Sequence, residues 1–454
     1  MSRQTADVVI CGAGIAGITA AYFLAVRFGV KKVVLVDERP PLTLTSDKST
    51  EAYRNWWPGP GTAMVDLMNR SIDLLEALAD EWGNAFHLNR RGYVYLTGSR
   101  PGGAALQHRA REIAALGAGP LRQHPGPDSY QPHHAEGFSN QPAGADLMLG
   151  RETIQAHFPY LAEDITTALH TRRCGWLSAQ QLGMLSLQRA REAGVRFQSG
   201  RVKAVQLAGG RVTAVQVNDG WIDTPCFVNA AGPFLAAVGC LLGLDLPVFN
   251  ELHGKLAFID YQQVIPRDAP MMIWDDPLTL PWSKAEKEEL AAYADTRWLL
   301  DELPAGLHFR PEGGPDSPIV LMLWPYHTER HEPIWPPPPL DEFFPDLVLR
   351  GLSRMIPALA TYIGRAGKPA IDRGYYCKTR ENRPLIGPLP VTGAYVFGAL
   401  SGFGIMAAPA GGELLAAHIT GHSLPDYAPA FHLNRYSDPD YQAQLADWGD
   451  SGQL

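Results

Sequence analysis

The chain has 454 residues, of which 46% are hydrophobic and 19% are charged, a composition typical of a globular protein with two or three domains. Its formal net charge is −8 and no cluster of Lys and Arg forms a basic face, so a general nucleic-acid-binding protein is excluded. The five cysteines are scattered and form no CxxC pair, which predicts neither disulfides nor a zinc site and indicates a cytoplasmic location.

The first predicted elements are a strand, a glycine turn and a helix. Residues 8–10 form an apolar strand that breaks at Gly12, and the helix runs from about residue 15 to residue 28. Gly14 lets the backbone approach a pyrophosphate, while Gly17 lets the helix pack closely on the strand. The N-terminus of the helix offers free N–H groups and positive dipole density to phosphates.

A second apolar strand, residues 33–37, ends in Asp37, which lies 20 residues after Gly17. A carboxylate at this distance can accept hydrogen bonds from ribose hydroxyls, and the neighbouring Glu38 is the alternative. These elements together predict a nucleotide cofactor, but they do not separate FAD from NAD. They also explain the one long apolar stretch, residues 8–26, so we expect no membrane span and no signal peptide.

The next segment changes character along its length. A polar loop at residues 43–50 is positioned to continue along the cofactor, and an amphipathic helix is predicted at residues 63–82. Residues 98–145 are rich in Gly, Pro and His, with only a short helical patch at residues 105–116, which predicts an exposed excursion. We predict no metal site here, because the spacing of the histidines matches no usual ligand set. They are His108, His124, His133 and His134.

The middle of the chain is predicted to return to the nucleotide domain. A helix at residues 182–193 precedes alternating strands at residues 195–197, 202–207 and 212–217. A buried strand at residues 227–229 and a glycine turn follow them. This order of elements leads back to the first domain.

Residues from about 247 to 375 combine strands at 252–259 and 319–324, a charged helix at 284–300 and many aromatic residues, and we predict that they form the substrate domain. Within them, the proline run 336–339 is interpreted as a stiff surface linker.

The last predicted elements are a strand at residues 394–399, a second glycine turn and a helix that ends near residue 420. The N-terminus of this helix can point at another anionic part of the same cofactor.

Four motifs in order resemble those of the FAD-dependent D-amino acid oxidase and sarcosine oxidase family. They are the N-terminal glycine motif, Asn229–Pro233, Arg383–Pro388 and Ser401–Gly404, and the resemblance extends from about residue 7 to residue 420. It implies an α/β plus α+β fold, with a discontinuous glutathione-reductase-type FAD-binding Rossmann domain and a substrate domain built on an antiparallel sheet. The predicted segments are 1–97 (FAD-binding, first part), 98–145 (surface excursion), 146–246 (mixed, returning to the FAD-binding domain), 247–375 (substrate domain), 376–424 (FAD-binding, last part) and 425–454 (C-terminal tail).

The resemblance implies that the cofactor is FAD. It places the pyrophosphate at the glycine motif, the adenosine ribose at Asp37, the adenine at Val202 and the flavin ring at residues 402–406. The predicted cofactor-binding residues are Gly12, Gly14, Ile15, Ala16, Gly17, Asp37, Glu38, Thr45, Ser46, Lys48, Ser49, Val202, Ala231, Gly232, Gly402, Phe403, Gly404, Ile405 and Met406.

Attachment of the flavin is predicted to be non-covalent. Some family members tether it through a histidine in the first loop, where this chain has Asp47, Lys48 and Ser49. Attachment through a cysteine stays open at this stage, because Cys377 lies a few residues from the family's cysteine position, which aligns with Gly374.

Two lysines of sarcosine oxidases have no counterpart in this chain. The lysine that helps to bind the substrate carboxylate corresponds to Met406, and the lysine that promotes reaction with oxygen falls near Met322 or Leu323. Loss of the second cation favours a dehydrogenase, although the electron acceptor can be either oxygen or a redox carrier.

The resemblance implies oxidation of the C–N bond of an amine or amino acid, of the secondary, N-methyl or D-amino acid type, by hydride transfer to flavin N5. Arg54 is the candidate clamp for a substrate carboxylate, or else it forms a structural ion pair or a cofactor contact. His253 and Lys255 share one face of a strand, which is either a substrate-binding face or a solvent face. Tyr326 and His327 end another strand and are further candidates, with core residues as the alternative.

Two other functions are considered. One is a flavin-dependent 2-hydroxy acid dehydrogenase, which would need a histidine base such as His253 or His327. The other is a non-enzymatic flavoprotein that acts as an assembly factor, which an exposed apolar patch and an occluded flavin would favour.

Overall fold

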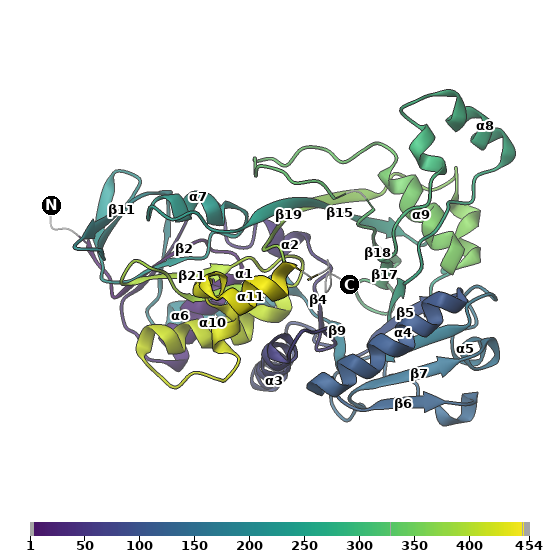
Figure 1. Cartoon of the computed structure of the whole chain (residues 1–454), viewed down its shortest axis with the longest axis horizontal. Helices are drawn as coiled ribbons and strands as arrows, with labels where there is room; N and C mark the ends of the chain where they lie inside the picture. The colour runs from purple at the N-terminus through teal and green to yellow at the C-terminus, as the bar shows by residue number, and fades with distance from the viewer. Residues whose placement is uncertain (1–3, 327, 447, 449–454) are drawn as a thin grey trace.

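The computed structural model describes residues 4–326, 328–446 and 448, and the strands in this part of the chain form four sheets (Figure 1). A six-stranded sheet has the order β10-β3-β2-β14-β21-β20, with the first five strands parallel and β20 antiparallel to β21. The strands span Val8–Cys11 (β2), Val33–Asp37 (β3), Arg196–Ser199 (β10), Phe227–Asn229 (β14), Leu385–Pro388 (β20) and Ala394–Gly398 (β21). The nucleotide domain is therefore assembled from distant parts of the chain.

Both faces of this sheet are buried, as the apolar runs in its strands require. Val33 and Leu35 of β3 belong to the core that contains the helices, whereas Val34 and Val36 belong to a second core. The helices are α1 (Ile15–Tyr22, continued by a π-helical turn), α6 (Ala179–Glu192) and α10 (Gly404–Thr420). The second core lies against a four-stranded sheet of β1 (Gln4–Thr5), β13 (Gly220–Asp223), β12 (Arg211–Val217) and β11 (Val202–Ala208).

The glycine turn after β2 is closed by a direct backbone contact. A Cβ atom on Gly17 would lie 1.8 Å from the carbonyl oxygen of Gly12, so only glycine allows α1 to approach the turn this closely. Gly12 has a φ of +110°, a conformation that side chains other than glycine rarely adopt. The role predicted for Gly17, close packing of the helix, matches this geometry.

A nine-stranded sheet forms the second domain, in the order β19-β15-β18-β17-β16-β5-β8-β7-β6 (Figure 1). It contains most of the predicted substrate domain and keeps that name below. All neighbouring strands are antiparallel except the pairs β16/β5 and β6/β7. The strands span Tyr93–Thr97 (β5), Leu121–His124 (β6), Ala145–Leu149 (β7), Thr167–Thr171 (β8), Phe249–Ile259 (β15), Met271–Trp274 (β16), Leu307–Pro311 (β17), Ile319–Leu323 (β18) and Ala370–Lys378 (β19).

Residues 98–145 differ from the exposed excursion predicted for them. They contain α4 (Arg100–Ile113), which buries Leu106, Ala110 and Ile113, and β6, which pairs with β7 at the edge of the nine-stranded sheet. The sheet thus takes four strands from residues before 247, beyond the predicted segment 247–375. The short, polar sequence of β6 lacks the apolar alternation that identifies a strand, because an edge strand has fewer neighbours to pack against.

The remaining elements connect these sheets. A two-stranded sheet pairs β4 with β9. The charged helix is shorter than the predicted range 284–300, because α8 ends at Ala292 and is followed by a separate 3-10 turn at Arg297–Leu300. No helix among the described residues is long and apolar enough to cross a bilayer. The bounds are Thr45–Lys48 (α2), Ala52–Arg54 (β4), Ala63–Glu81 (α3), Arg151–His157 (α5), Cys174–Trp176 (β9), Leu235–Cys240 (α7), Lys284–Ala292 (α8), Phe344–Met355 (α9) and Pro439–Ala446 (α11).

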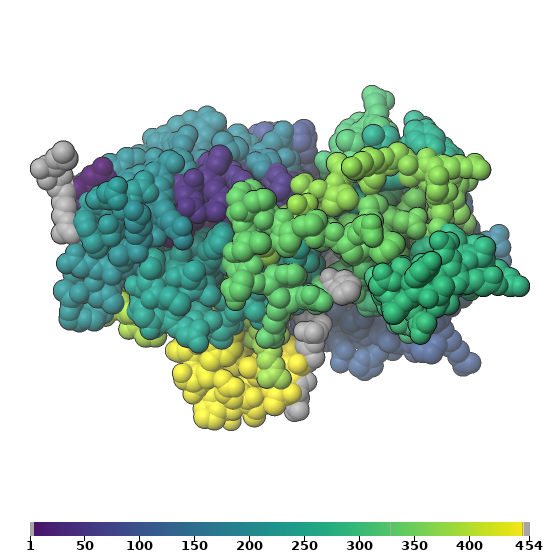
Figure 2. Space-filling view, turned by 90° about the horizontal axis from the view of Figure 1, so that it is seen from above, coloured from purple at the N-terminus to yellow at the C-terminus, as the bar shows by residue number. Residues whose placement is uncertain are grey.

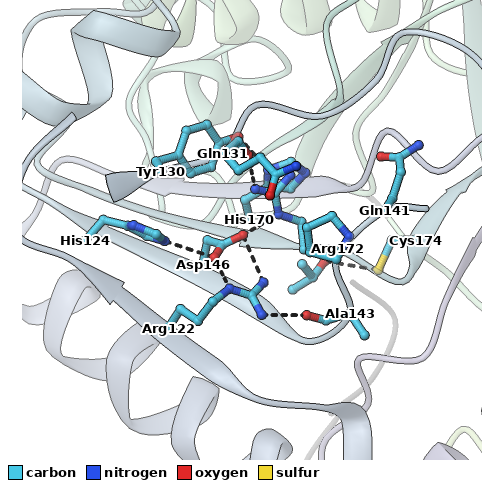
Figure 3. Close-up of polar contacts among 12 residues, drawn as sticks. Arg122, His124, Tyr130, Gln131, Gln141, Ala143, Asp146, His170, Arg172 and Cys174 are labelled. Atoms are coloured by element: carbon cyan, nitrogen blue, oxygen red, sulfur yellow. Dashed lines mark hydrogen bonds and ion pairs between the residues drawn. The ribbon is translucent and has the colours of Figure 1, made fainter. Parts of the chain in front are cut away.

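A buried ionic cluster holds the far edge of the nine-stranded sheet (Figure 3). Asp146 of β7 accepts hydrogen bonds from Arg172, from Arg122 at 2.5 Å and from His124 Nε2 at 2.9 Å. Burial alone would raise the pKa of Asp146, but the hydrogen bonds and the charge of Arg172 outweigh it and hold this pKa well below its usual value. His124 is thus a structural group, and no three His, Cys, Asp or Glu side chains gather as metal ligands within the described residues.

Candidate active site

Three adjoining cavities form one trough from the nucleotide domain to the substrate domain. The outer pocket, about 570 Å³ in volume, shares Gly12 and Asp37 with a central channel. The central channel shares Gly402 with an inner cavity under the nine-stranded sheet. The trough begins where β2 and β3 end, which is where open α/β sheets bind their ligands.

The central channel is built around the N-terminus of α1. Gly14 and Ile15 line it, and the Ile15 N–H donates a hydrogen bond to Ser46 Oγ at 3.0 Å. Gly14 has an extended backbone that other residues can adopt, and a Cβ atom there would lie 3.3 Å from Ser46 Oγ. A Cβ atom on Gly14 would therefore point into the central channel, whereas a Cβ atom on Gly17 would clash with the backbone.

Asp37 lies between the outer pocket and the central channel. Its carboxylate accepts hydrogen bonds from the backbone N–H groups of Ala13 at 2.7 Å and Arg39 at 2.9 Å. Burial raises the pKa of Asp37 despite these hydrogen bonds. Glu38 lines the outer pocket and forms an ion pair with Arg39 at 2.7 Å. Sequence reasoning missed Arg39, which borders both cavities.

The structure brings together most of the predicted cofactor-binding residues. Two lie elsewhere: Gly17 packs against the turn, and Lys48 forms ion pairs with Asp47 at 2.6 Å and Asp372 at 3.1 Å, outside the residues that line the trough. The central channel is lined by Gly12, Gly14, Ile15, Ala16, Asp37, Thr45, Ser46, Ser49, Ala231, Gly232, Gly402, Gly404 and Ile405. Glu38 and Val202 line the outer pocket, and Phe403 and Met406 line the inner cavity.

These residues fit an FAD molecule. The outer pocket offers two carboxylates to a ribose, the glycine turn and the N-terminus of α1 face the channel, and the helix α10 begins at the turn beside the inner cavity. At Gly402 a Cβ atom would lie 2.5 Å from the ring of Tyr376, so glycine at this position allows that ring to pack against the turn. The trough thus has the chemistry of an extended dinucleotide site.

Cys377 of β19 lines the central channel. Burial raises the pKa of the Cys377 thiol to about 12, so the thiolate that would attack a flavin is scarce at neutral pH. Gly374, which aligns with the family's cysteine, lies against Lys48. This geometry agrees with non-covalent FAD.

Arg54 lines the inner cavity from β4. Arg54 is only 2% exposed. Its Nη1 donates a hydrogen bond to the hydroxyl of Tyr95 at 3.1 Å, and its guanidinium carbon lies 4.4 Å from the ring centroid of Trp57. These contacts fix the guanidinium in one orientation at the wall of the cavity. A guanidinium held in this way is suited to a bidentate hydrogen bond with a carboxylate.

The solvent-face interpretation of His253 and Lys255 is wrong, because both residues are buried. His253 lines the inner cavity, stacks on Tyr376 at 4.0 Å between ring centroids, and places Nε2 3.2 Å from Glu251. Burial lowers the pKa of His253, although Glu251 opposes this shift. Lys255 instead donates to the backbone carbonyls of Asp47 and Ser49, each at 3.2 Å, and supports the loop beside the central channel.

His308 of β17 is a residue of the inner cavity that sequence reasoning missed. It is 4% exposed, and its Nδ1 lies 2.7 Å from the carbonyl oxygen of Gly306. Because a carbonyl only accepts, Nδ1 carries the proton and Nε2 keeps a lone pair. A signal was present in the sequence: His308 and Arg310 alternate with Leu307 and Phe309, as His253 and Lys255 do in β15.

Tyr326 lies outside the residues that line the inner cavity, although Pro325 is among them. Its hydroxyl donates to Asp341 at 2.6 Å and its ring stacks on Trp298 and Phe344. The prediction of a catalytic Tyr326 is therefore not supported by its position. His327 lies outside the described residues.

We expect His308 to make the stability of the protein depend on pH. Burial lowers the pKa of His308 from 6.5 to about 4, so below pH 6.5 the unfolded chain binds a proton that the folded protein does not. The stability that His308 contributes is complete above pH 6.5 and is lost as the pH falls toward 4. Between about pH 7.5 and about pH 5 the loss should be about 2 kcal/mol. Urea unfolding at both pH values should show that the free energy of unfolding falls less in His308→Asn than in the wild type. In His108→Asn, which changes an exposed histidine, it should fall as much as in the wild type. An equal loss in all three proteins would contradict this role.

A trough of this form, joining a nucleotide domain to a pocket in a second domain, defines a two-domain flavin-dependent oxidoreductase. The chain belongs to the DAO family of FAD-dependent oxidoreductases, because the family's sequence profile matches residues 7–418. The recognition made from the four motifs is thus confirmed, and FAD is the cofactor of the family.

Solved structures with the same fold cover nearly the whole chain. L-proline dehydrogenase from P. horikoshii has a TM-score of 0.73 at 19% identity, covering 96% of this chain and 99% of that chain. Glycine oxidase from Geobacillus kaustophilus has a TM-score of 0.72 at 17% identity, covering 95% of this chain and 99% of that chain. Iminodiacetate oxidase from Chelativorans sp. BNC1 has a TM-score of 0.67 at 20% identity, covering 94% of this chain and 98% of that chain. No curated protein matches the sequence. The predicted fold class is confirmed.

Proposed function

We propose that the enzyme oxidises the C–N bond of an amine that carries a carboxylate, such as an amino acid or an N-methyl amino acid. The observation that carries this proposal is the position of Arg54, which lines the same cavity as the glycine turn Gly402–Met406. A substrate whose carboxylate binds Arg54 would have its α-carbon held near that turn. FAD, when bound, supplies the hydride acceptor for this carbon.

The residues of the inner cavity have distinct tasks in this proposal. Arg54 binds and orients the carboxylate, which fixes the direction in which the α-carbon faces. The neutral Nε2 of His308 accepts a hydrogen bond from the substrate nitrogen or holds its proton. Leu323, Trp324 and Tyr376 line the cavity and exclude water.

The named substrates of the similar structures support this class. L-proline, glycine and iminodiacetate are all amines that carry a carboxylate. The proposal transfers only this shared chemistry to the present chain, and the particular amine is left to experiment.

We further propose that the enzyme is a dehydrogenase and acts in the cytoplasm. Met322 is buried in β18 and Leu323 lines the inner cavity, and neither offers the cation that favours reaction with oxygen. All five cysteines are free, as expected in a reducing compartment.

Anaerobic titration tests the proposed function. Secondary amines, D- and L-amino acids and 2-hydroxy acids are added one at a time to the holoprotein, and bleaching of the oxidised flavin band near 450 nm identifies the bond that is oxidised. Bleaching by amino acids supports the proposal, and slow recovery of the band in air supports a dehydrogenase. Denaturing the protein with acid should release the flavin into solution, because we expect no covalent bond.

A second candidate function is oxidation of a 2-hydroxy acid. The observation that favours it is the presence of two histidines, His253 and His308, in the inner cavity, since a neutral imidazole can take the proton of a hydroxyl group. Bleaching by 2-hydroxy acids alone would select this function. A non-enzymatic assembly factor is not retained, because the chain belongs to a family of oxidoreductases.

A further inference from the structure

A segment of the substrate domain reaches back over the nucleotide domain. It is the loop between β18 and α9, and its described residues 328–343 are called the strap below. Figure 1 shows this green loop leaving the substrate domain and running above β15 and β19 toward the nucleotide domain. Figure 2 shows the green residues lying beside the purple and teal residues of that domain.

The strap is anchored to the two strands beneath it. The N–H of His331 donates to the carbonyl oxygen of Asn250 in β15 at 2.8 Å. The N–H of Ile334 lies 3.2 Å from the hydroxyl of Tyr375, and Arg373 Nε donates to the carbonyl oxygen of Pro337 at 3.1 Å, both from β19. These bonds hold the strap in place on either side of residue 335.

The proline run Pro336–Pro339 gives this part of the strap its stiffness. Proline fixes φ and offers no N–H group, so the run has few backbone conformations available to it. A residue at its start is presented with little loss of conformational entropy on binding. That residue is Trp335.

Trp335 lines the outer pocket of the trough together with Asp37, Glu38 and Val202. It is the one residue of the substrate domain among the described residues that line this pocket. The guanidinium carbon of Arg39 lies 5.3 Å from the ring centroid of Phe234 and 5.7 Å from that of Trp335, so Arg39 bridges the strap and the nucleotide domain. Trp335 is nevertheless 44% exposed, which is unusual for so large an apolar side chain.

We propose that Trp335 is a cofactor-binding residue that covers the adenine of FAD, so that the substrate domain takes part in holding the cofactor through the strap. The pocket already provides carboxylates for the ribose, and a flat indole at its wall matches a flat purine. Aromatic side chains bind bases of any sequence through their faces. The exposed part of Trp335 becomes covered when the base is bound.

Binding of FAD and of ADP to full-length flavin-free protein tests the proposal, because ADP carries the adenosine without the flavin. In calorimetric titrations, Trp335→Ala should raise the Kd of both ligands by about five- to 150-fold, the range expected for loss of an aromatic partner of a base. Trp335→Phe, which keeps an aromatic face, should recover most of the affinity.

Ile334→Ala is the matched control, since Ile334 is the exposed neighbour of Trp335 in the strap and lies outside the residues that line the pocket. Its affinity for FAD and ADP should equal that of the wild type. The proposal is overturned if Trp335→Ala binds ADP as tightly as the wild type, or if Ile334→Ala weakens binding as much as Trp335→Ala. Unchanged thermal unfolding of the flavin-free variants shows that the fold is intact. None of these measurements depends on the identity of the substrate.

Discussion

Replacing Gly14 by valine should yield folded protein that is purified without FAD. The valine side chain would occupy the central channel beside Ser46, in the space next to the N-terminus of α1 where a pyrophosphate binds. The extended backbone at Gly14 suits valine, so the fold should survive. We expect the affinity for FAD to fall by about a thousandfold or more, measured as loss of the flavin spectrum and by titration with FAD.

Two further variants make this result specific. Gly367→Val changes an exposed glycine that has open space around its Cα, and it should keep its flavin. Gly17→Ala should instead lower the thermal stability of the protein, because its Cβ would clash with the backbone of Gly12. A yellow Gly14→Val protein would show that the pyrophosphate does not lie at this turn.

Replacing Arg54 by alanine should abolish most turnover of a carboxylate-bearing amine while FAD stays bound. Truncating one partner of a buried charge pair costs about 2–5 kcal/mol, which corresponds to a fall of about 30- to 5000-fold in kcat/KM. When Arg54→Ala is mixed with substrate under anaerobic conditions, its oxidised flavin band should bleach more slowly than that of the wild type. The flavin content of the variant should equal that of the wild type.

Chemical rescue separates binding of the substrate from a structural role of Arg54. Added guanidinium ion can fill the space left in Arg54→Ala and should restore part of the turnover, whereas it cannot repair a disturbed fold. Arg54→Lys should turn over substrate more slowly than the wild type, since a lysine cannot form the bidentate contact with the carboxylate. If the flavin is lost from Arg54→Ala, Arg54 belongs to the cofactor site and the proposed clamp is wrong.

The nucleotide site was largely predictable because its elements are close in sequence. The strand, turn, helix and acid between Val8 and Asp37 are local features, and each has a physical signature that periodicity and glycine placement reveal. The glycine turn before α10 was predictable in the same way. The direction of the Lys48 side chain could not be predicted in this way, because it depends on Asp372 from a distant strand: the ammonium group lies against Asp47 and Asp372.

The inner cavity was harder to predict because it is assembled from strands that are far apart in the chain. Arg54 comes from β4, His253 from β15 and His308 from β17, and no local pattern shows that β15 and β17 both flank β18. The sequence cannot say which face of a strand is buried when polar residues alternate with apolar ones. For the same reason the sequence does not connect Trp335 with the nucleotide domain, since Arg39, which contacts its ring, lies far away in sequence.

The discontinuous sheet of the nucleotide domain also has a consequence for the synthesis of the protein. β2 and β3 leave the ribosome first, but β21 and the turn that closes the trough are made only after residue 394. A nascent chain therefore exposes the glycine motif and its apolar strands for most of translation without a complete flavin site. FAD therefore cannot be fully enclosed until β21 and this turn have been made, which places cofactor loading late in the synthesis of the chain or after it.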